Sequence, residues 1–542
     1  VANGNTLIIR GGGSLVLSDA ANQEAWIGHR SDGTMRIESG SYSSTGQQLR
    51  LSTNGNNNQG HLVIGDGIGP SGDATFTLNG DALQVKQGNN TGAGFLTINT
   101  DGQVSNTRLL VGNGGDGTAV MNGNATFETN TGTGINYVGV NNNGTGSLTL
   151  NDNAVFTFRG TRGLRIGGQH DGAEGTMTLN GNSQFIGTAG GSENSDRGLV
   201  VGRGGDATLN INDNALINLA STLTVAGLGN NSAGDTATVN HNGGTVVTVM
   251  DLFVGRQGNA NYTLTSGSVT ARDLRLGYQS GTGTFTQNGG TVQLTGRDLW
   301  TGEFNNNTGD GVYNLLGGTL KVDNIDLDDP GNPGIDGVFN WGGGTLTMSF
   351  PNNKATPGTI DYTTTDPING VGQIVRSGTT IAVDGDLSTG FGGATSVLDL
   401  GGLYIDDGTR VDIMEITGTL DLSGADHLIS VDSPNLLRPI GGSAIDYGSI
   451  PLVTATGGIT GGSFNSFAAP MADARPFYAS PFAVSDPANL KPNTFYIETT
   501  GDTVWFHYKV TGTVPEPGTG LLFGLGVLMV RGLHRLRRKD PA

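Results

Sequence analysis

Two pairs of neighbouring acids are the residues best suited by type and spacing to acid–base chemistry. They are Asp328-Asp329 and Asp406-Asp407. Glycoside hydrolysis uses two carboxylates held at a set separation across a cleft. Adjacent residues of a strand point to opposite faces, and both pairs stand beside a Pro or a Gly. We therefore interpret them as acids of turns and predict no catalytic residues.

The sequence signals for other kinds of catalytic or binding site are also weak. There is no Cys, which excludes disulfides, thiol catalysis and thiolate metal sites, and the seven His are scattered at positions 29, 61, 170, 241, 427, 507 and 534. The segment Gly112-Asn113-Gly114-Gly115-Asp116-Gly117 matches the dinucleotide pattern G-x-G-x-x-G, but 95 glycines make chance matches common and no strand–helix context follows. It also has the Gly/Asp character of calcium-binding nonapeptides, which occur in tandem arrays that this chain lacks. We predict no cofactor and no metal site, and leave weak calcium binding open.

The amino-acid composition indicates which secondary-structure elements would carry a functional site. Gly makes up 95 of the 542 residues, against an average usage of about 7%. Val, Ile, Leu and Thr recur between Gly and Asn positions, a mixture typical of many short strands joined by tight turns. A single globular core stops growing at roughly 250–300 residues, so we expect an elongated array of repeats.

The charge of the chain is unevenly spread. The formal net charge is −19, and residues 514–542 hold five bases and two acids, which leaves −22 on the preceding residues. An acidic body repels nucleic acid, so we predict no nucleic-acid partner. The balance suits a hydrated, exported protein.

Internal repetition is the strongest signal in the sequence. One pattern, called here the anchor, is a short apolar run that ends in Gly. Its copies are Trp26-Ile27-Gly28, Leu62-Val63-Ile64-Gly65, Leu109-Leu110-Val111-Gly112, Tyr137-Val138-Gly139, Leu164-Arg165-Ile166-Gly167, Leu199-Val200-Val201-Gly202, Leu252-Phe253-Val254-Gly255 and Leu274-Arg275-Leu276-Gly277, with variants at Ala226 and Leu299-Trp300-Thr301-Gly302. From Gly65 onward a second block follows, as in Gly146-Ser147-Leu148-Thr149-Leu150-Asn151, and a third apolar run closes the unit.

Each unit therefore predicts three short strands separated by Gly/Asn turns, which suits one rung of a three-sided coil. Stacked rungs place equal positions over one another. Counting five residues past the second-block Asn gives Phe127, Phe156, Phe185 and Ile217. We interpret these as one column of the core; the alternative is an external aromatic ladder for sugar. The loop between anchor and second block varies most in length, so its corner is a candidate binding side.

These patterns predict an all-β, right-handed parallel β-helix, or solenoid, over residues 1–350. The repeat fades after Phe350, and Pro351, Pro357 and Pro367 indicate irregular coils over 351–394. Strand-like runs return over 395–511, which we expect to form a C-terminal β cap module on the last rung. Residues 512–542 form a separate tail. The chain begins Val1-Ala2-Asn3, and we expect that a signal peptide precedes the mature protein.

One stretch near the end of the body resembles the autotransporter-like β-helical surface proteins. It runs from Tyr447 to Gly461 and contains Gly458-Ile459-Thr460-Gly461. In those proteins a similar Gly-Ile-Thr-Gly stretch precedes the last strands. The segment that follows here lacks long alternating strands.

The tail has three parts in order: Pro515-Glu516-Pro517, an uncharged apolar run from Gly518 to Val530, and a basic end that includes Arg535, Arg537, Arg538 and Lys539. It resembles a PEP-CTERM sorting signal. The resemblance implies an exosortase as processing partner, a short transmembrane helix that anchors the chain transiently, and a Gram-negative-type bacterium that makes exopolysaccharide. The positive-inside rule keeps the basic end cytoplasmic, so the body lies across the inner membrane before release to the cell surface or matrix.

Together these features predict a structural or adhesin-type protein and not an enzyme. Its expected partners are exopolysaccharide, biofilm matrix or neighbouring cell-surface proteins. The alternative is a β-helical polysaccharide lyase or hydrolase, because this fold also supports such enzymes. An enzyme should gather acids and aromatics in one groove over a few adjacent rungs, whereas a structural protein should have an evenly polar surface.

Overall fold

The alternation of apolar and polar residues determines which face of each strand is buried and which is exposed. In the strand Thr145–Leu150 the second, fourth and sixth residues are buried, and the others are partly or fully exposed. The same six-residue pattern recurs in the strands of the following units. Successive side chains of a strand point to opposite faces, so each such strand seals one side of a common interior.

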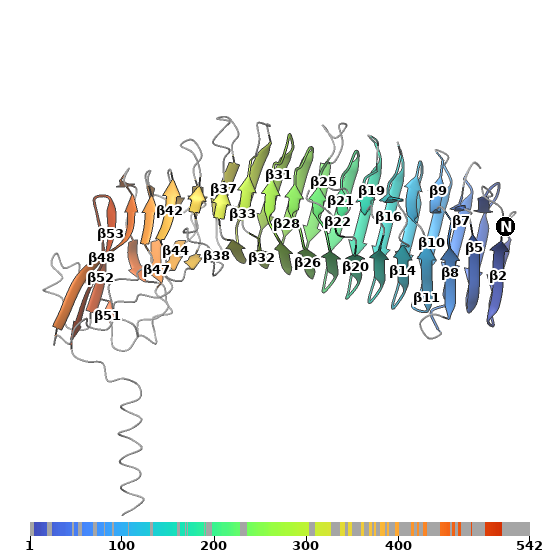
Figure 1. Cartoon of the computed structure of the whole chain (residues 1–542), viewed down its shortest axis with the longest axis horizontal. Helices are drawn as coiled ribbons and strands as arrows, with labels where there is room; N and C mark the ends of the chain where they lie inside the picture. The colour runs from blue at the N-terminus through green and yellow to red at the C-terminus, as the bar shows by residue number, and fades with distance from the viewer. Residues whose placement is uncertain are drawn as a thin grey trace, which may run out of the picture.

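The computed structural model shows this arrangement as a long stack of short strands (Figure 1). The structure describes residues 5–18, 24–45, 48–52, 57–68, 73–80, 82–88, 91–106, 108–129, 134–141, 143–159, 163–168, 170, 172–188, 190, 198–227, 236–296, 298–302, 309–322, 324–326, 337–341, 345–348, 359–361, 368–370, 373–375, 380–384, 387–389, 396–399, 413–416, 420–421, 427–430, 445–455, 458–460, 464–467, 478–479 and 494–511. Within these ranges the secondary structure is strand, turn and bend, with no helix.

Every third strand belongs to the same sheet, so the chain builds three long sheets in turn. Sheet A consists of β1 (Thr6–Ile9), β4 (Gly33–Ile37), β7 (Gln59–Ile64), β10 (Ala93–Ile98), β13 (Gly117–Met121), β16 (Thr145–Leu150), β19 (Glu174–Leu179), β22 (Asp206–Ile211), β25 (Thr236–His241), β28 (Asn259–Leu264), β31 (Thr282–Gln287), β34 (Asp310–Leu315), β37 (Gly337–Trp341), β40 (Ile368–Gly370), β43 (Leu387–Thr389), β46 (Leu420–Asp421) and β49 (Ile459–Thr460).

Sheet B follows sheet A within each turn of the coil. It consists of β2 (Gly13–Ser18), β5 (Gly40–Thr45), β8 (Ala74–Leu78), β11 (Gly102–Asn106), β14 (Thr126–Thr129), β17 (Val155–Phe158), β20 (Gln184–Gly187), β23 (Leu216–Leu219), β26 (Thr245–Thr248), β29 (Ser268–Ala271), β32 (Thr291–Leu294), β35 (Thr319–Val322), β38 (Thr345–Met348), β41 (Gln373–Val375), β44 (Ser396–Asp399), β47 (His427–Ser430) and β50 (Phe464–Phe467).

Sheet C closes each turn. Its strands are β3 (Glu24–Ile27), β6 (Gln48–Leu51), β9 (Leu83–Gln87), β12 (Leu109–Asn113), β15 (Asn136–Val138), β18 (Leu164–Ile166), β21 (Leu199–Val201), β24 (Leu223–Val225), β27 (Leu252–Val254), β30 (Leu274–Leu276), β33 (Asp298–Thr301), β36 (Asn324–Asp326), β39 (Thr359–Asp361), β42 (Thr380–Asp384), β45 (Ile413–Ile416) and β48 (Ile445–Ala455), joined at the end by β53 (Thr503–Thr511), β52 (Thr494–Thr500) and β51 (Tyr478–Ala479).

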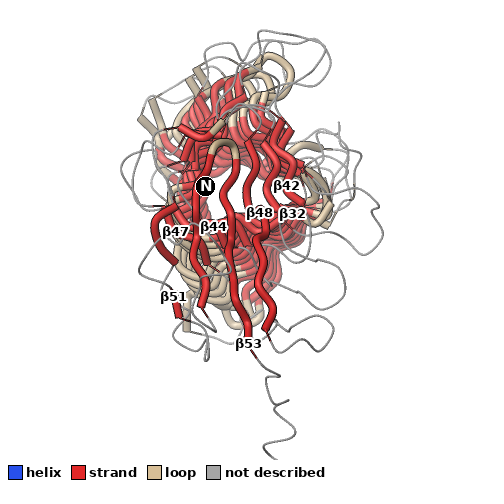
Figure 2. Tube along the Cα trace, turned by 90° about the vertical axis from the view of Figure 1, so that its left-hand side faces the viewer, coloured by secondary structure: helices blue, strands red, loops and turns tan. Residues whose placement is uncertain are grey.

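Neighbouring strands of successive turns pair in parallel, for example β13 with β16, β17 with β20 and β27 with β30. Paired strands lie about 4.7–4.9 Å apart, which sets the height of one rung. Seen end-on, the strands surround a common axis (Figure 2). The predicted all-β architecture of a parallel β-solenoid is therefore confirmed.

The corner between sheets C and A explains why the anchor ends in Gly. Gly112 has φ +70°, which side chains with a Cβ rarely adopt, and a Cβ there would lie 2.3 Å from the carbonyl oxygen of Thr145 on the next rung. The expected left-handed glycine corners are confirmed. One anchor copy was assigned wrongly: Leu62-Val63-Ile64-Gly65 lies in β7 of sheet A. On sheet C the corresponding corner residues are Ser52, directly after β6, and Lys86, near the end of β9, with φ 53° and 74°. These residues take the left-handed conformation without Gly, so the pattern missed them.

The predicted core column is also confirmed. Phe127, Phe156 and Phe185 are buried in sheet B, with ring centroids 4.8 Å apart for the first pair and 5.5 Å for the second. Ile217 pairs in register with Phe185 and continues the column. The alternative of an external aromatic ladder at these four positions is wrong, because all of them face the interior.

A ladder of asparagine amides joins the rungs at the corner between sheets A and B. Each Asn donates from its Nδ2 to the Oδ1 of the Asn one rung earlier, at distances of 2.8–3.1 Å from Asn151 to Asn242. The ladder consists of Asn122, Asn151, Asn180, Asn212 and Asn242. A second amide ladder, at the more exposed residues Asn124, Asn153, Asn182 and Asn214, runs beside it.

The parallel stack ends on antiparallel strands. β48 pairs in parallel with β45 and antiparallel with β53, which in turn pairs antiparallel with β52. Parallel pairing extends from the clear repeats through β38, β41, β44, β47 and β50. The domain boundaries expected at 350, 394 and 511 stay predictions. Among the residues that the structure describes, there is no apolar helix of membrane-spanning length; the expected transmembrane helix falls outside them.

Candidate functional site

The residues predicted for sorting lie outside the described part of the chain. These are Pro515, Glu516, Pro517, Arg535, Arg537, Arg538 and Lys539. The acid pairs Asp328-Asp329 and Asp406-Asp407 also fall outside it. Their roles therefore stay predictions.

The glycine-rich segment from Gly112 to Gly117 forms the corner between β12 and β13. Gly112 and Gly114 have φ +70° and +85°, and the chain enters a strand at Gly117. This is a strand–turn–strand corner, so the strand–helix context of a dinucleotide site is absent at this segment. In the described ranges, no three His, Asp or Glu side chains are grouped as a metal site would require.

A group of charged and aromatic side chains in mutual contact lies on the outer face of sheet C. The middle residue of each short strand there points outward. Phe253 of β27, Arg275 of β30 and Trp300 of β33 stand in register on successive rungs. We call this group, together with Asp251, Arg256, Arg272, Asp273 and Tyr278, the sheet C cluster.

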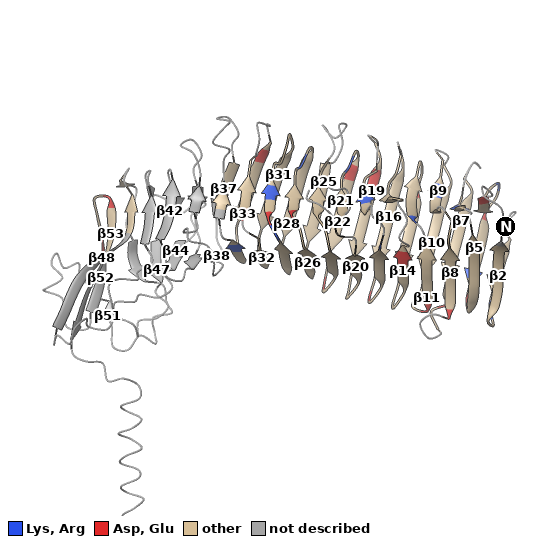
Figure 3. Ribbon diagram, in the orientation of Figure 1, with Lys and Arg blue, Asp and Glu red and all other residues tan. Residues whose placement is uncertain are grey.

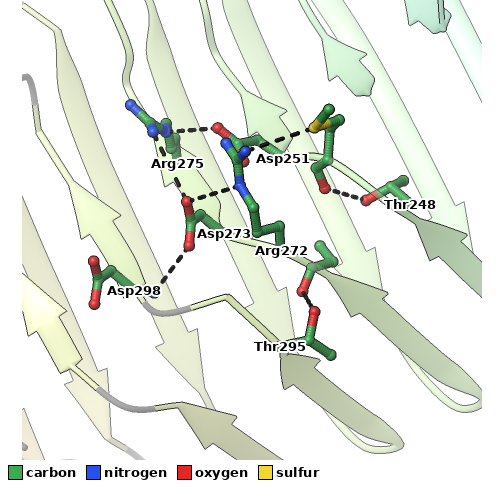
Figure 4. Close-up of polar contacts among 9 residues, drawn as sticks. Thr248, Asp251, Arg272, Asp273, Arg275, Thr295 and Asp298 are labelled. Carbon is green, nitrogen blue, oxygen red and sulfur yellow. Dashed lines mark hydrogen bonds and ion pairs between the residues drawn. The ribbon is translucent and has the colours of Figure 1, made fainter. Parts of the chain in front are cut away.

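Two acids at the start of the strands hold the arginines of the cluster (Figure 4). Asp251 accepts from Arg272 Nη2 at 2.6 Å and lies 2.9 Å from Arg275 Nε. Asp273 lies 3.4 Å from Arg272 Nε. Its Oδ1 also accepts from the backbone N–H of Asp298 on the next rung, at 3.2 Å. The acids and arginines therefore connect three rungs across the strand direction.

Guanidinium groups stack against the aromatic rings of the cluster. Arg275 lies 5.8 Å from the ring centroid of Phe253 and 5.7 Å from that of Trp300. Arg256 lies 5.2 Å from the ring of Phe253, and Tyr278 packs against the same ring at 5.2 Å. Such contacts are worth about 0.5–2 kcal/mol, most where water is excluded. The cluster alternates cation and ring along the axis of the solenoid.

Burial decides what this cluster can do chemically. The Asp251 side chain has no exposed surface, and burial raises the pKa of its carboxyl while Arg275 and Arg272 oppose that shift. Asp273, a like charge, adds to the rise in the pKa of Asp251. A carboxylate closed from solvent and shared by two guanidinium groups cannot reach a sugar substrate as it stands. The arrangement suits a brace that fixes the rungs to one another.

None of the sequence motifs indicated the sheet C cluster, although the sequence contains a signal for it. An Asp precedes the anchor in three consecutive units, in Asp251-Leu252-Phe253-Val254-Gly255, Asp273-Leu274-Arg275-Leu276-Gly277 and Asp298-Leu299-Trp300-Thr301-Gly302. The central residue changes from ring to guanidinium to ring. Aligning the anchors by rung and reading the outward position would have found it.

Comparisons with known proteins add no relative. No family model, no curated protein sequence and no solved structure matches this chain. The likenesses of the tail and of residues 447–461 therefore stay resemblances, and the function is argued from the residues and their geometry.

Proposed function

We propose that this protein is an exported structural or adhesin-type protein, sorted to the cell surface or matrix by an exosortase and associated with exopolysaccharide. It is then no enzyme, its tail is a transient membrane helix, and its coil is right-handed. The antiparallel strands β52 and β53 serve as its C-terminal cap.

One observation carries this proposal: the described solenoid presents the same kind of surface over rung after rung. Figure 3 shows that most drawn strands are uncharged and that many of the acids lie near strand ends. The charged group on sheet C is paired internally, as the ion pairs of Asp251 indicate. A long, repetitive and weakly charged surface supports many equal weak contacts, as a spacer or adhesin requires.

The tail adds the sorting part of the proposal. Pro515-Glu516-Pro517 precedes an apolar run and a basic end, the order that the PEP-CTERM resemblance requires. Basic residues beside an apolar segment are retained on the cytoplasmic side. The body is then exported while the tail holds it at the membrane until cleavage.

The test is fractionation of the full precursor in a bacterium with and without its exosortase gene. We expect the wild-type chain in the surface and matrix fractions, shortened near residue 515, only when the exosortase is present. Replacing Pro515 and Pro517 by Ala should leave the full-length chain in the inner membrane. Pro541→Ala is the matched control, because it changes a proline of the same tail beyond the motif. Equal release of all variants without the exosortase would refute the sorting proposal.

The sheet C cluster gives the enzyme alternative its one specific observation. It places Asp251, Asp273 and several rings on three adjacent rungs, where a carbohydrate-active enzyme would concentrate them. Measuring new reducing ends and unsaturated uronate products from a panel of polysaccharides tests it. Turnover that disappears in Asp273→Asn, with the solenoid still folded, would establish the alternative and overturn the structural proposal.

A further inference from the structure

The outer face of sheet A has two continuous columns of short, uncharged side chains. Each strand from β13 to β34 contributes one residue to each column, and these residues stand in register from rung to rung. The first residue of the six-residue strands also faces outward, and it forms a third, mixed column beside the other two that includes Glu174, Asp206 and Asp310. The first column is Thr118, Ser147, Thr176, Thr208, Thr238, Asn261, Thr284 and Val312, and the second is Val120, Thr149, Thr178, Asn210, Asn240, Thr263, Thr286 and Asn314. Except at Val120 and Val312, hydroxyl and amide groups therefore form a regular two-column lattice, with rungs about 4.7–4.9 Å apart.

Hydrogen bonds along the second column fix several of these side chains. Asn240 donates from Nδ2 to Asn210 Oδ1 at 2.9 Å, and Asn210 donates to Thr178 Oγ1 at 3.3 Å. Asn314 donates to Thr286 Oγ1 at 3.2 Å. Side chains that are already ordered lose less conformational entropy when a ligand binds.

An aromatic pair stands in line with the first column, at its N-terminal end. His61 of β7 pairs in register with Phe95 of β10, and Phe95 pairs with Thr118. The two rings are stacked, with centroids 4.6 Å apart and an angle of 9° between their planes. Both side chains are partly exposed on this outer face. A flat ring surface that adjoins rows of hydroxyls offers an apolar platform beside hydrogen-bonding groups.

The other two faces lack this combination. On sheet B the outward columns are interrupted by Glu128, Ile186 and Lys321. On sheet C the outward residues Val200, Thr224 and Phe253 are each 1% exposed, and the partly exposed residues that follow them in the column, Arg275 and Trp300, belong to the sheet C cluster. Sheet A is therefore the face where a polymer could contact uncharged side chains over many rungs.

We propose that the outer face of sheet A, from the His61–Phe95 pair to Asn314, is a docking track for a neutral, extended polysaccharide. The apolar face of a sugar ring packs on the aromatic pair, and the sugar hydroxyls exchange hydrogen bonds with the Thr and Asn columns. A neutral polymer is favoured over a polyanion because the track has no cation and the chain has a net charge of −19. Many weak contacts at one polymer then add up to a measurable avidity. This inference rests on the proposed function and names its ligand class and face.

The test is co-sedimentation of the protein released by the producing cells with insoluble cellulose, curdlan and chitin, and its retention on bead-coupled alginate, a polyuronate. Phe95→Ala removes the platform, and Thr178→Arg puts a long charged side chain in the middle of the track. Thr157→Arg is the matched control, because Thr157 is a partly exposed outward residue of sheet B. Circular dichroism and thermal unfolding verify that each variant is folded. We expect at least about tenfold weaker binding to a neutral polymer for the two track variants and less than about twofold for the control.

The outcomes separate this inference from the function on which it rests. Loss of neutral binding in the track variants alone supports both. Equal neutral binding by all variants overturns the track and leaves a glycan-binding protein. Binding to alginate alone likewise overturns the neutral ligand and keeps the proposed function. If no polymer is retained, both the track and the exopolysaccharide association are wrong.

Discussion

Two regions of the solenoid, the rungs from β13 to β23 and those from β25 to β35, place their aromatic core side chains on opposite sheets. In the first region the aromatic side chain is on sheet B, as Phe156, and faces an aliphatic Leu148 on sheet A. In the second region it is on sheet A, as Phe285, and faces Val292 on sheet B. Around β22 to β26 both positions are aliphatic, where the aromatic column changes sides.

This exchange shows that either sheet can supply the large ring of the core. The number of rings per rung varies, because the rung of β17 buries both Phe156 and Phe158, whereas the rungs around β22 to β26 have no ring at these positions. Protein interiors are close-packed, so a change of side-chain volume at one of these positions must be accommodated by its neighbours. The aromatic columns stack along the axis in both regions, for example Phe285 with Tyr262 at 4.6 Å and with Tyr313 at 5.1 Å. The ring is thus supplied by sheet B in the first region and by sheet A in the second.

The second region differs in having tyrosines, which bring hydroxyls into the core. Nδ1 of His241 lies 2.9 Å from the hydroxyl of Tyr262, and its Nε2 faces the carbonyl of Gly244 at 3.4 Å. A carbonyl only accepts, so Nε2 holds the hydrogen and Nδ1 accepts from Tyr262. The hydroxyl of Tyr313 similarly donates to the Oε1 of Gln287. Each buried hydroxyl has its partner one rung before, on the same sheet.

The side-chain contacts that join neighbouring rungs outside the core also differ between the two regions. The first region is tied by neutral Asn amides, and the second by the ion pairs of the sheet C cluster. The first region, tied by amides that do not titrate, should change little with pH. The second should lose stability when charge is removed from the cluster, and its response to acid should come from the buried His241. Four predictions test this difference between the two regions.

The largest effect should come from removing the acid at the centre of the sheet C cluster. Asp251→Ala leaves Arg272 and Arg275 without their buried carboxylate, and breaking a buried pair typically costs about 3–5 kcal/mol. Hydrogen exchange of peptides from β24 to β33 should show this loss, while peptides from β13 to β20 stay protected. Asp310→Ala, at an exposed strand start, is the control and should change exchange by less than about 0.5 kcal/mol. Unchanged protection in Asp251→Ala would show that the cluster is no brace.

The second-largest effect should come from acid, which we expect to lower the local stability of the second region. Burial lowers the pKa of His241 to about 4, against about 6.5 in an unfolded chain, a difference of about 3 kcal/mol. The unfolded state binds the proton first, so stability is full above pH 6.5, falls between about pH 6.5 and pH 4, and is constant below. Local exchange around β25 and β28 measured across this range should follow that curve.

A matched double variant separates this titration from general acid unfolding. His241→Leu with Tyr262→Phe removes the titrating ring and the hydroxyl together. The new residues are of the types found at the same positions one rung later, where Leu264 pairs with residue 241 and Phe285 pairs with residue 262. We expect its β25–β28 exchange to lose the step between pH 6.5 and pH 4. A step of the same size in the double variant would assign the acid response to another group.

The fold was largely predictable because a solenoid repeats local rules. Apolar alternation, Gly corners and the Phe column could be read directly from the sequence, and each is found in the structure. The misplaced anchor at Leu62–Gly65 shows the limit of that reading. Ser52 and Lys86 take a left-handed conformation that residue type alone does not favour, so the turn is decided by the rungs above and below.

The sheet C cluster was harder to predict because its members are far apart in the sequence. Asp251 and Arg275 meet only because one turn of the coil brings β27 beside β30. The same holds for the Thr and Asn columns of sheet A, where each strand contributes two unremarkable residues. Register, which the sequence defines only after the anchors are aligned correctly, turns such residues into a surface.

The third prediction moves the ring in the first region to the side that the second region uses. Leu148→Phe alone adds a ring to a rung that already buries Phe156 and Phe158, and it should cost about 1–3 kcal/mol through overpacking. Adding Phe156→Val should recover most of that loss, because the rung then has the arrangement seen for Phe285 and Val292. Hydrogen exchange of β16 and β17 in both single variants and the double gives the coupling energy. Additive losses would mean that the two positions do not share one volume.

The smallest effect should come from the amide ladder of the first region. Asn151 donates to Asn122 at 2.9 Å and accepts from Asn180 at 2.9 Å, at a partly buried corner. Asn151→Ala removes both bonds, and water can replace each only in part, so we expect a loss of about 1 kcal/mol in the local stability of β16 and β19. Asn153→Ala makes the same change in the exposed ladder, whose bonds are 3.1 and 3.2 Å long, and solvent should compensate it more completely. The loss should not vary between pH 7 and pH 4, since amides do not titrate. Equal costs for the two variants would mean that burial of the corner adds nothing to the ladder, and the first region would then rest on its ring column alone.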